Sequence, residues 1–303
     1  MRTQFCDAMV QRSTNERMIF LTGDLGFMAL EPLQAALGIR FINAGVAEQN
    51  MISVAAGLAR QRFDVWAYSI APFCYARPFE QIRNDVAFHG LPVKLVGNGG
   101  GYGYGVMGPT HHAIEDCAVM LCLPNMSVYV PVFDEDVGSA VERAGAGKGA
   151  SYLRLGRGEK PKDYVIPPYA AWRELCEGGS DAVVIALGPL AGTYIGAVES
   201  LPFDRRPHLW AVSELPIAKN PMPQALVAQL AHSSILCVAE EHVRRGGLGS
   251  ELAFTLVDGD LTAGRFVHLY AKAHHYDRYG SQGYLRRSSG LDAQSLLSAI
   301  GQA

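Results

Sequence analysis

A single carboxylate stands at the start of a run of small and apolar residues, a setting in which it could move protons. Glu48 precedes a stretch through residue 58 that is rich in alanine and has no charged side chain. This pattern predicts a close-packed helix in which Val46, Val54 and Leu58 lie deep against a sheet. Glu48 is then expected in the first helical turn, where it either complements the helix dipole, worth about 0.3–1 kcal/mol, or acts as a general acid or base.

A glycine-rich loop farther along the chain ends in two adjacent histidines. Residues 108–112 are Gly-Pro-Thr-His-His, and histidine can donate or accept a proton near neutral pH. Gly103, Gly105 and Gly108 also satisfy the Gly-x-Gly-x-x-Gly pattern of dinucleotide-binding proteins. That interpretation is disfavoured, because the preceding strand is expected to end near Val96, too early for a tight turn, and a Pro-Thr pair separates the glycines from the next helix. The histidines therefore remain the candidates for chemistry in this loop.

Alternating apolar runs and helical stretches determine where these residues would lie. Each short apolar run has the length and composition of a buried parallel strand, and a loop and a helix follow most of them. Such alternation predicts an open α/β sheet with its ligand crevice beyond the carboxyl ends of the strands, where both motifs fall. The expected strands of this first unit span residues 18–21, 40–42, 65–68, 93–96, 127–130 and 152–155.

Prolines and charges between residues 160 and 168 predict a linker, and a second α/β unit follows it. The chain is thus expected to form two consecutive open, mainly parallel α/β sheet domains, residues 1–160 and 178–303, joined by a linker at 161–177. The second unit is expected to have strands at 182–187, 208–212 and 235–239 and helices at 190–201 and 249–257.

Residues 45–51, Gly-Val-Ala-Glu-Gln-Asn-Met, resemble the glutamate motif of the transketolase family of thiamine-diphosphate enzymes. The resemblance implies that Glu48 hydrogen-bonds a ring nitrogen of the cofactor's aminopyrimidine and helps to deprotonate the neighbouring thiazolium carbon. Residues 108–112 likewise resemble the family's Gly-Pro-Thr-His-Gln loop. By this resemblance Gly108 lies at the cofactor, His111 is catalytic and binds substrate oxygens, and His112 belongs to the substrate site.

An aromatic stretch, residues 68–85, begins at a strand end and runs into a helix. Aromatic residues at this spacing belong more often to a core than to a ligand site. The stretch nevertheless resembles the family's Tyr-Ser-x-Phe-like loop, whose aromatic ring stacks on the thiamine pyrimidine. The resemblance implies that Phe73 or Tyr75 contacts the cofactor, and the spacing leaves both open.

Further positions are compared with the family's substrate-binding residues. Residues 152–158 resemble the segment whose arginine holds substrate phosphate, which makes Arg154 and Arg157 candidates, with an ordinary surface arginine as the alternative. Met107 stands where transketolase has an aspartate that contacts a substrate hydroxyl, and Gly99 lies near the position of a substrate histidine. Loss of both polar groups is expected to change the donor or the acceptor, because the site loses its means of recognising hydroxyls.

The resemblance covers the last half of a transketolase and lacks the diphosphate-binding part. Residues 240–249 resemble a Glu-Glu-His, Gly-Gly-Leu-Gly stretch of the family's C-terminal domain, which mainly supports dimerisation. The family holds Mg²⁺ and diphosphate through Gly-Asp-Gly and a later asparagine, but no asparagine follows the only near match, residues 258–260. The histidine pairs at 111–112 and 274–275 lack a third ligand, so no metal site is expected here. The resemblance implies a partner chain with the diphosphate-binding domain and its Mg²⁺, in an α2β2 heterotetramer.

The composition disfavours several other classes of protein. A formal charge of −3 leaves no basic footprint for nucleic acid. No run of residues approaches the roughly 18 apolar residues of a membrane span, and the N-terminal residues lack the apolar core of a signal peptide. We therefore expect a cytoplasmic protein without nucleic-acid or membrane partners.

These observations together imply a subunit of a split, thiamine-diphosphate-dependent transketolase of carbohydrate metabolism. Such an enzyme transfers a two-carbon ketol unit from a ketose or ketose phosphate to an aldehyde, and this chain would be active only with its partner. The alternatives within the family are a 1-deoxyxylulose-5-phosphate synthase and the beta chain of a 2-oxoacid dehydrogenase. A non-catalytic regulatory or scaffold role is disfavoured, because such a chain would need neither Glu48 nor His111.

Overall fold

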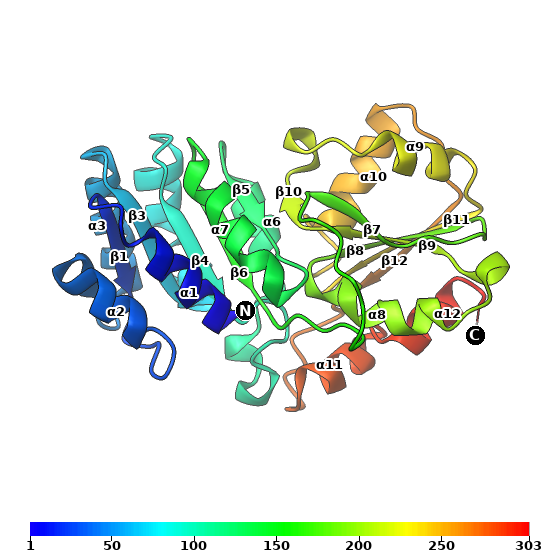
Figure 1. Cartoon of the computed structure of the whole chain (residues 1–303), viewed down its shortest axis with the longest axis horizontal. Helices are drawn as coiled ribbons and strands as arrows, with labels where there is room; N and C mark the ends of the chain where they lie inside the picture. Colours follow the sequence, from blue (N-terminus) through cyan, green and yellow to red (C-terminus); the bar gives the residue numbers. More distant parts are fainter. Residues whose placement is uncertain (303) are drawn as a thin grey trace.

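Two α/β units lie side by side in the computed structural model, which describes residues 1–302 (Figure 1). The first unit is built on a seven-stranded sheet with the order β10-β5-β6-β4-β3-β1-β2. Neighbouring strands in it are parallel except β10 and β5, which pair antiparallel. Its strands are β1 (Met18–Thr22), β2 (Phe41–Asn43), β3 (Asp64–Ile70), β4 (Lys94–Asn98), β5 (Ser127–Tyr129), β6 (Ser151–Leu155) and β10 (Glu214–Leu215).

The second unit is built on a five-stranded sheet with the order β12-β11-β8-β9-β7. Only β7 runs antiparallel to its neighbour, β9, at one edge of this sheet. The strands are β7 (Trp172–Cys176), β8 (Ala182–Leu187), β9 (His208–Val212), β11 (Ile235–Glu240) and β12 (Arg265–Tyr270).

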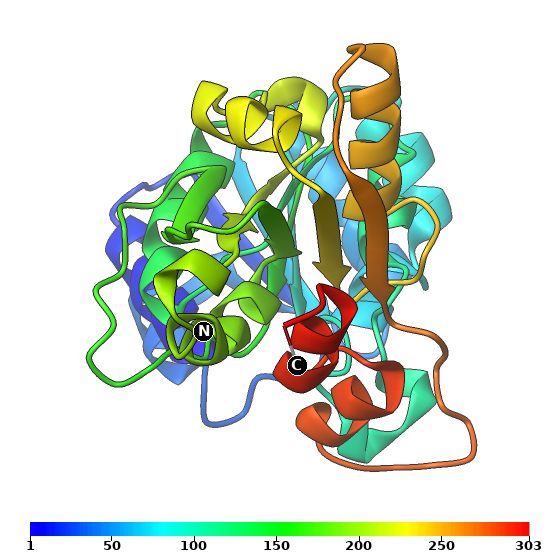
Figure 2. The same cartoon turned by 90° about the vertical axis from the view of Figure 1, so that its right-hand side faces the viewer.

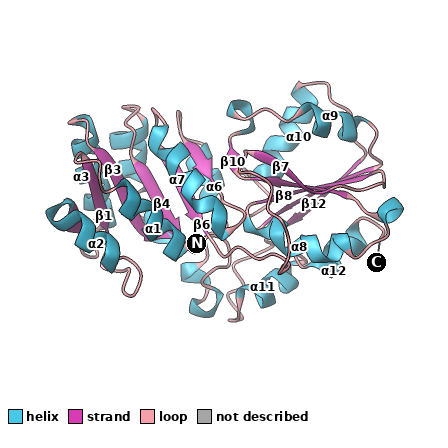
Figure 3. Cartoon of the chain, in the orientation of Figure 1, coloured by secondary structure: helices cyan, strands magenta, loops and turns pink. Residues whose placement is uncertain are grey.

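Helices cover both faces of each sheet (Figure 3). In the first unit α1, α2 and α7 pack on one face and α3, α4 and α6 on the other. In the second unit α8 and α12 cover one face, and α9 and α10 cover the other. The longer helices are α1 (Arg2–Arg12), α2 (Glu31–Leu37), α3 (Glu48–Arg60), α4 (Ala71–Tyr75), α6 (Asp116–Leu121), α7 (Val137–Ala146), α8 (Pro189–Glu199), α9 (Gln224–Ala231), α10 (Leu248–Asp258), α11 (Gln282–Ser289) and α12 (Ala293–Ala299).

The two units are joined by more than the chain that connects them. One apolar core runs from the α3, α4 and α6 side of the first sheet to the α9 and α10 side of the second. Helix α11 also contacts the turn η3 (Gly105–Met107), which lies next to η4 (Pro109–His111) in the histidine loop. Seen from the side, the orange-red C-terminal helices lie beside this teal loop (Figure 2). The C-terminal segment therefore packs against the loop that carries His111.

The prediction of two consecutive open, mainly parallel α/β sheets is confirmed. Strands β8 and β9 have the predicted bounds, and the other predicted strands differ from the observed ones by one to three residues at their ends. Three strands were not predicted. Residues 172–176, inside the expected linker, form β7, residues 214–215 of the second unit complete the first sheet as β10, and residues 265–270 form β12. All three are edge strands; β7 and β10 pair antiparallel with partners distant in sequence, and β12 pairs parallel with β11.

The buried face of α3 differs from the predicted one. Val46 precedes the helix and is 79% exposed, and Val54 is 40% exposed, so these valines do not lie deep against the sheet. Glu48, Met51, Ile52, Ala55, Ala56 and Ala59 form the buried face instead. Their spacing of three or four residues puts them on one side of a helix, opposite Val54.

Within residues 1–302, no helix is both long enough and apolar enough to cross a membrane.

Candidate active site

Glu48 begins helix α3, and its carboxylate is almost fully buried. Gly45 makes the turn into the helix with a φ of 69°, which favours glycine, and its N–H donates to the Asn43 side chain at 2.8 Å. Glu48 is 6% exposed and accepts two hydrogen bonds from Nη1 of Arg77, at 3.0 and 3.1 Å. An open hollow of about 440 Å³ lies beside this pair and is lined by residues 46–50 and Arg77. The buried carboxylate of Glu48 thus lies at the border of an open hollow.

Phe73 lies between the Glu48–Arg77 pair and the histidine loop. The Arg77 guanidinium is 3.8 Å from the centre of the Phe73 ring, a cation–π contact. The His111 ring meets Phe73 edge-on, with 5.1 Å between ring centres. Tyr75 is buried instead, and its hydroxyl donates to Glu115 at 3.2 Å. Of the two aromatic candidates, Phe73 is the one that contacts Arg77, a residue that lines the hollow.

His111 ends the turn η4 and stays accessible. Gly108, with a φ of 83°, sets the path of the loop, as a glycine can at low cost. Nδ1 of His111 lies 3.0 Å from the Thr110 hydroxyl, and Nε2 makes no hydrogen bond within residues 1–302. Burial, and then the positive charge of Arg77, lower the pKa of His111. The imidazole is therefore neutral at pH 7, with one ring nitrogen available.

His112 points into the junction between the two units. It is 2% exposed, and its ring stacks in parallel on His274, with 5.9 Å between ring centres. Burial, and then the charge of His274, lower the pKa of His112 to about 4. His274 in turn bonds Glu115, which also accepts from Tyr75. This position differs from the expected substrate site, because His112 is covered by the second unit.

The two predicted phosphate-binding arginines have different settings. Arg154 is 4% exposed, and its Nε donates to Asp116 at 2.8 Å. Its Nη2 donates to the main-chain oxygens of Ala113 and Glu241, both at 2.9 Å. These contacts make Arg154 a tie between the two units, whereas Arg157, two residues beyond the end of β6, is exposed.

Two tyrosines that the sequence did not single out pack on glycines of the histidine loop. Tyr104 fills the space beside Gly99, where a Cβ would lie 2.2 Å from the Tyr104 ring. Tyr279 of the second unit packs on Gly108, where a Cβ would lie 2.1 Å from its ring. Met107 is 54% exposed. No local spacing identifies Arg77, Tyr104 or Tyr279 as site residues, because each gains its place through contacts formed in the folded chain.

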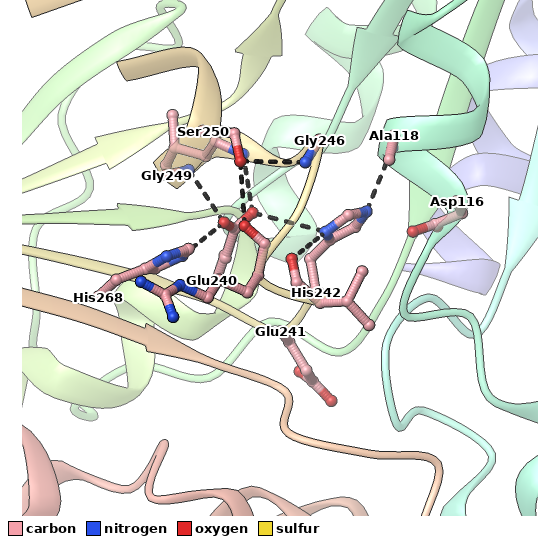
Figure 4. A network of polar contacts seen from close by, with 12 residues as sticks. Asp116, Ala118, Glu240, Glu241, His242, Gly246, Gly249, Ser250 and His268 are labelled. Carbon is pink, nitrogen blue, oxygen red and sulfur yellow. Dashed lines mark hydrogen bonds and ion pairs between the residues drawn. The ribbon is translucent and has the colours of Figure 1, made fainter. Parts of the chain in front are cut away.

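The Glu-Glu-His stretch serves the docking of the second unit. Glu240 accepts the main-chain N–H groups of Leu248 and Gly249 at 2.8 and 2.9 Å and contacts His268 (Figure 4). His242 accepts the N–H of Ala118 at 3.2 Å, across the junction. This network holds the start of α10 and ties the second unit to α6.

The fold is that of a two-unit α/β protein with a buried carboxylate beside an open hollow. Residues 12–162 match the family described as "Transketolase, pyrimidine binding domain". A protein named "Putative transketolase C-terminal section" from Methanocaldococcus jannaschii is 30% identical over 265 residues, which cover 86% of this chain and 82% of that protein. The chain therefore belongs to the transketolase family.

Other similar proteins include a chain of comparable length and longer enzymes. One subunit of an apulose-4-phosphate transketolase from Phocaeicola vulgatus is 28% identical and is matched over 84% of this chain and 83% of that protein. "1-Deoxy-D-xylulose-5-phosphate synthase" of Thermomicrobium roseum is 30% identical over 94% of this chain and 45% of that enzyme. The solved structure "Split gene transketolase, inactive beta4 tetramer" superposes with a TM-score of 0.82 at 28% identity, over 100% of this chain and 97% of that one.

Proposed function

We propose that this chain is the smaller subunit of a split transketolase that depends on thiamine diphosphate. The enzyme would transfer a two-carbon ketol unit from a ketose to an aldehyde, and the sugar-phosphate names of its relatives favour phosphorylated substrates. The activity would require a second chain with the diphosphate-binding domain and its Mg²⁺, in an α2β2 heterotetramer in the cytoplasm.

The setting of Glu48 carries this proposal. A carboxylate that is 6% exposed and borders an open hollow can still bond a ring nitrogen, because only one nitrogen of Arg77 occupies it. Phe73, half buried beside the pair, offers an aromatic surface for a heterocycle. These residues fit an aminopyrimidine, and we assign Glu48, Phe73 and the Gly108 turn to the cofactor.

The partner is inferred from the groups that this chain offers. Within residues 1–302, no three His, Cys, Asp or Glu side chains are placed together to hold a metal ion. Mg²⁺ prefers several oxygen ligands, often including phosphate oxygens. We therefore assign Mg²⁺ and the diphosphate to the second chain, which would close the hollow beside Glu48.

Each residue of this half-site has a distinct task in the proposed reaction. Thiamine diphosphate, when bound, supplies the nucleophilic carbon that takes up the two-carbon unit. Glu48 would share a proton with the ring nitrogen that it bonds. His111, neutral at pH 7, would donate from Nε2 to an oxygen of the ketose or aldehyde, while Thr110 holds Nδ1. Arg157 would attract a substrate phosphate.

Reconstitution tests the proposed function. The purified chain alone should show no ketol transfer and weak binding of thiamine diphosphate, and addition of the second chain should restore both. Transfer would be measured with xylulose 5-phosphate and ribose 5-phosphate, and cofactor binding by calorimetry. Tight, Mg²⁺-dependent binding of the cofactor to this chain alone would contradict the shared site.

The synthases among the relatives favour a second candidate, a deoxyxylulose-phosphate-synthase-like reaction. The exposed Met107, an apolar side chain four residues before His111 in the same loop, is compatible with a donor fragment that lacks a hydroxyl. Competing ketose and 2-oxoacid donors in the reconstituted complex would separate the two candidates. Use of a 2-oxoacid, with ketoses left unreacted, would favour the second.

A further inference from the structure

Tyr104 is placed beside the proposed substrate site by an unusual backbone position. Gly99, directly after β4, has a φ of 81°, a conformation that L side chains rarely adopt. A Cβ at Gly99 would lie 2.2 Å from Cδ2 and Cε2 of Tyr104, so the tyrosine ring occupies the space that any side chain at position 99 would need. The Tyr104 ring thus takes the place that a side chain at position 99 would occupy at the end of β4.

The Tyr104 hydroxyl is held by one neighbour in a way that leaves its proton free. Asn98, the last residue of β4, donates from Nδ2 to the Tyr104 oxygen at 2.6 Å. Because the amide is the donor in this bond, the phenol can donate its own proton elsewhere. Burial raises the pKa of Tyr104, against smaller lowering effects of Arg2 and Asn98, so the phenol stays protonated at neutral pH.

The surroundings of Tyr104 identify what it could bind. Its ring is half buried and lies 6.3 Å from the His111 ring, centre to centre. The neighbouring exposed side chains of Val106 and Met107 cannot donate hydrogen bonds. A substrate oxygen near His111 would therefore find the Tyr104 hydroxyl as a second, uncharged donor.

We propose that Tyr104 is a substrate-binding residue whose hydroxyl, oriented by Asn98, donates a hydrogen bond to a hydroxyl or phosphate oxygen of the sugar substrate. This inference rests on the proposed function, because it takes the substrate to be a sugar or sugar phosphate held at His111. Asn98 is a positioning residue that acts through Tyr104. The residues proposed for the cofactor are Glu48, Phe73 and the Gly108 turn, so we expect the affinity for thiamine diphosphate not to depend on Tyr104.

Tyr104→Phe tests the proposal in the reconstituted complex, because it keeps the ring beside Gly99 and removes only the hydroxyl. Loss of one hydrogen bond of this kind should raise the KM for ribose 5-phosphate by about tenfold, with kcat and the affinity for thiamine diphosphate unchanged. The matched control is Tyr284→Phe, which removes a hydroxyl from a partly exposed tyrosine of α11 and should leave KM unchanged. An unchanged KM in Tyr104→Phe, or equal losses of substrate and cofactor affinity, would overturn the proposal.

A double-mutant cycle tests the role of Asn98. Asn98→Ala should raise the KM less than Tyr104→Phe does, because it removes only the group that orients the Tyr104 hydroxyl. In the double variant, Asn98→Ala should add little to the effect of Tyr104→Phe, since no hydroxyl is left to orient. Fully additive effects would overturn the claim that Asn98 acts through Tyr104.

Direct binding separates this inference from the proposed function. Calorimetric titration of the complex with ribose 5-phosphate needs no turnover, and Tyr104→Phe should weaken that binding by about tenfold. If the wild-type complex binds this probe and Tyr104→Phe weakens that binding, but no ketol unit is transferred, the proposed reaction fails while the role of Tyr104 is supported. If the complex transfers ketol units and Tyr104→Phe binds the probe as wild type does, the inference fails alone.

Discussion

The carboxyl edges of the two sheets differ in what surrounds their carboxylates. At the first sheet, Glu48 is paired only with the half-exposed Arg77 and borders a hollow of about 440 Å³. At the second sheet, Glu241 is bonded by Arg286 at 2.7 Å, by Gln282 at 3.1 Å and by the N–H of Tyr102 at 2.7 Å. The cavity left there holds about 10 Å³, at the lower limit for one water.

Glu48 can therefore interact with a bound ligand, whereas Glu241 is enclosed and stabilises the junction between the two units. Open α/β sheets bind ligands beyond the carboxyl ends of their strands, so both edges are potential sites. The second edge is filled by its own ion pair and by the turn at residues 100–102 of the first unit. The first edge keeps a carboxylate that borders an open hollow, an aromatic ring and a neutral histidine, which is why we assign chemistry to it alone.

The largest effect is expected from removing the charge at the open edge. Glu48→Gln should slow exchange of the cofactor's reactive C–H in the reconstituted complex by about 10²–10⁴-fold, the usual contribution of a general acid or base. The free energy of unfolding should change little, because Arg77 is half exposed and can be solvated when it loses its partner. Exchange would be started in deuterated water, quenched with acid at set times and measured by NMR.

Glu31→Gln is the matched control for this change. Glu31 also lies in the first turn of a helix, α2, but is exposed and bonds only its local backbone. If both variants exchange at the wild-type rate, Glu48 merely complements a helix dipole and the contrast between the two edges disappears.

At the closed edge the change should appear in stability. Glu241→Gln leaves the Arg286 guanidinium, 5% exposed, with only the half-exposed Glu159, 3.8 Å away, as a charged partner. Breaking such a buried pair costs about 3–5 kcal/mol of unfolding free energy, measured by urea denaturation. Asp277→Asn, which breaks an exposed pair with Arg278, should cause no measurable loss. Equal stability of the two variants would show that the junction is not closed in solution.

The junction should also respond to pH through His112. The pKa of this imidazole is lowered from about 6.5 to about 4, first by burial and then by His274, with His275 and Glu241 also facing it. The unfolded chain binds the proton below about pH 6.5 and the folded chain does not, so stability should fall as the pH drops from about 6.5 to 4. His112→Gln should flatten this dependence, whereas His89→Gln, at an exposed site, should leave it as in the wild type. A His112 that titrates near pH 6.5 by NMR would mean that water reaches the junction.

The smallest effect is expected at the rim of the open edge. Met107 cannot accept a hydrogen bond from a substrate hydroxyl with the strength of a carboxylate, so weak use of ordinary pentose phosphates is expected. Met107→Asp should move the ratio of kcat/KM values toward hydroxylated donors or acceptors by about tenfold. Val106→Asp, one residue away and also exposed, is the control and should not shift the ratio. Efficient use of xylulose 5-phosphate by the wild-type complex would exclude Met107 as a specificity determinant.

Much of this architecture follows from local sequence. The apolar runs of β8 and β9 and the small-residue stretch after Glu48 are continuous signals, and they predicted the strands and the helix start that the structure shows. The motif order, Glu48 before His111, sufficed to indicate the family. These features are recoverable because hydrophobic periodicity and turn residues act within a few positions of one another.

Tertiary structure alone decided which of these residues face one another. Arg77 lies 29 residues from Glu48, and the main-chain oxygen of Glu241 that Arg154 bonds lies 87 residues away, so no local pattern could predict either pairing. The same holds for β7 and β10, whose partners are distant strands. Sequence periodicity fixes which face of an element is apolar, but the contacts of a polar side chain depend on which elements the fold brings together. For that reason Arg154 and His112 lie in the junction, while Phe73 and His111 remain at the open edge.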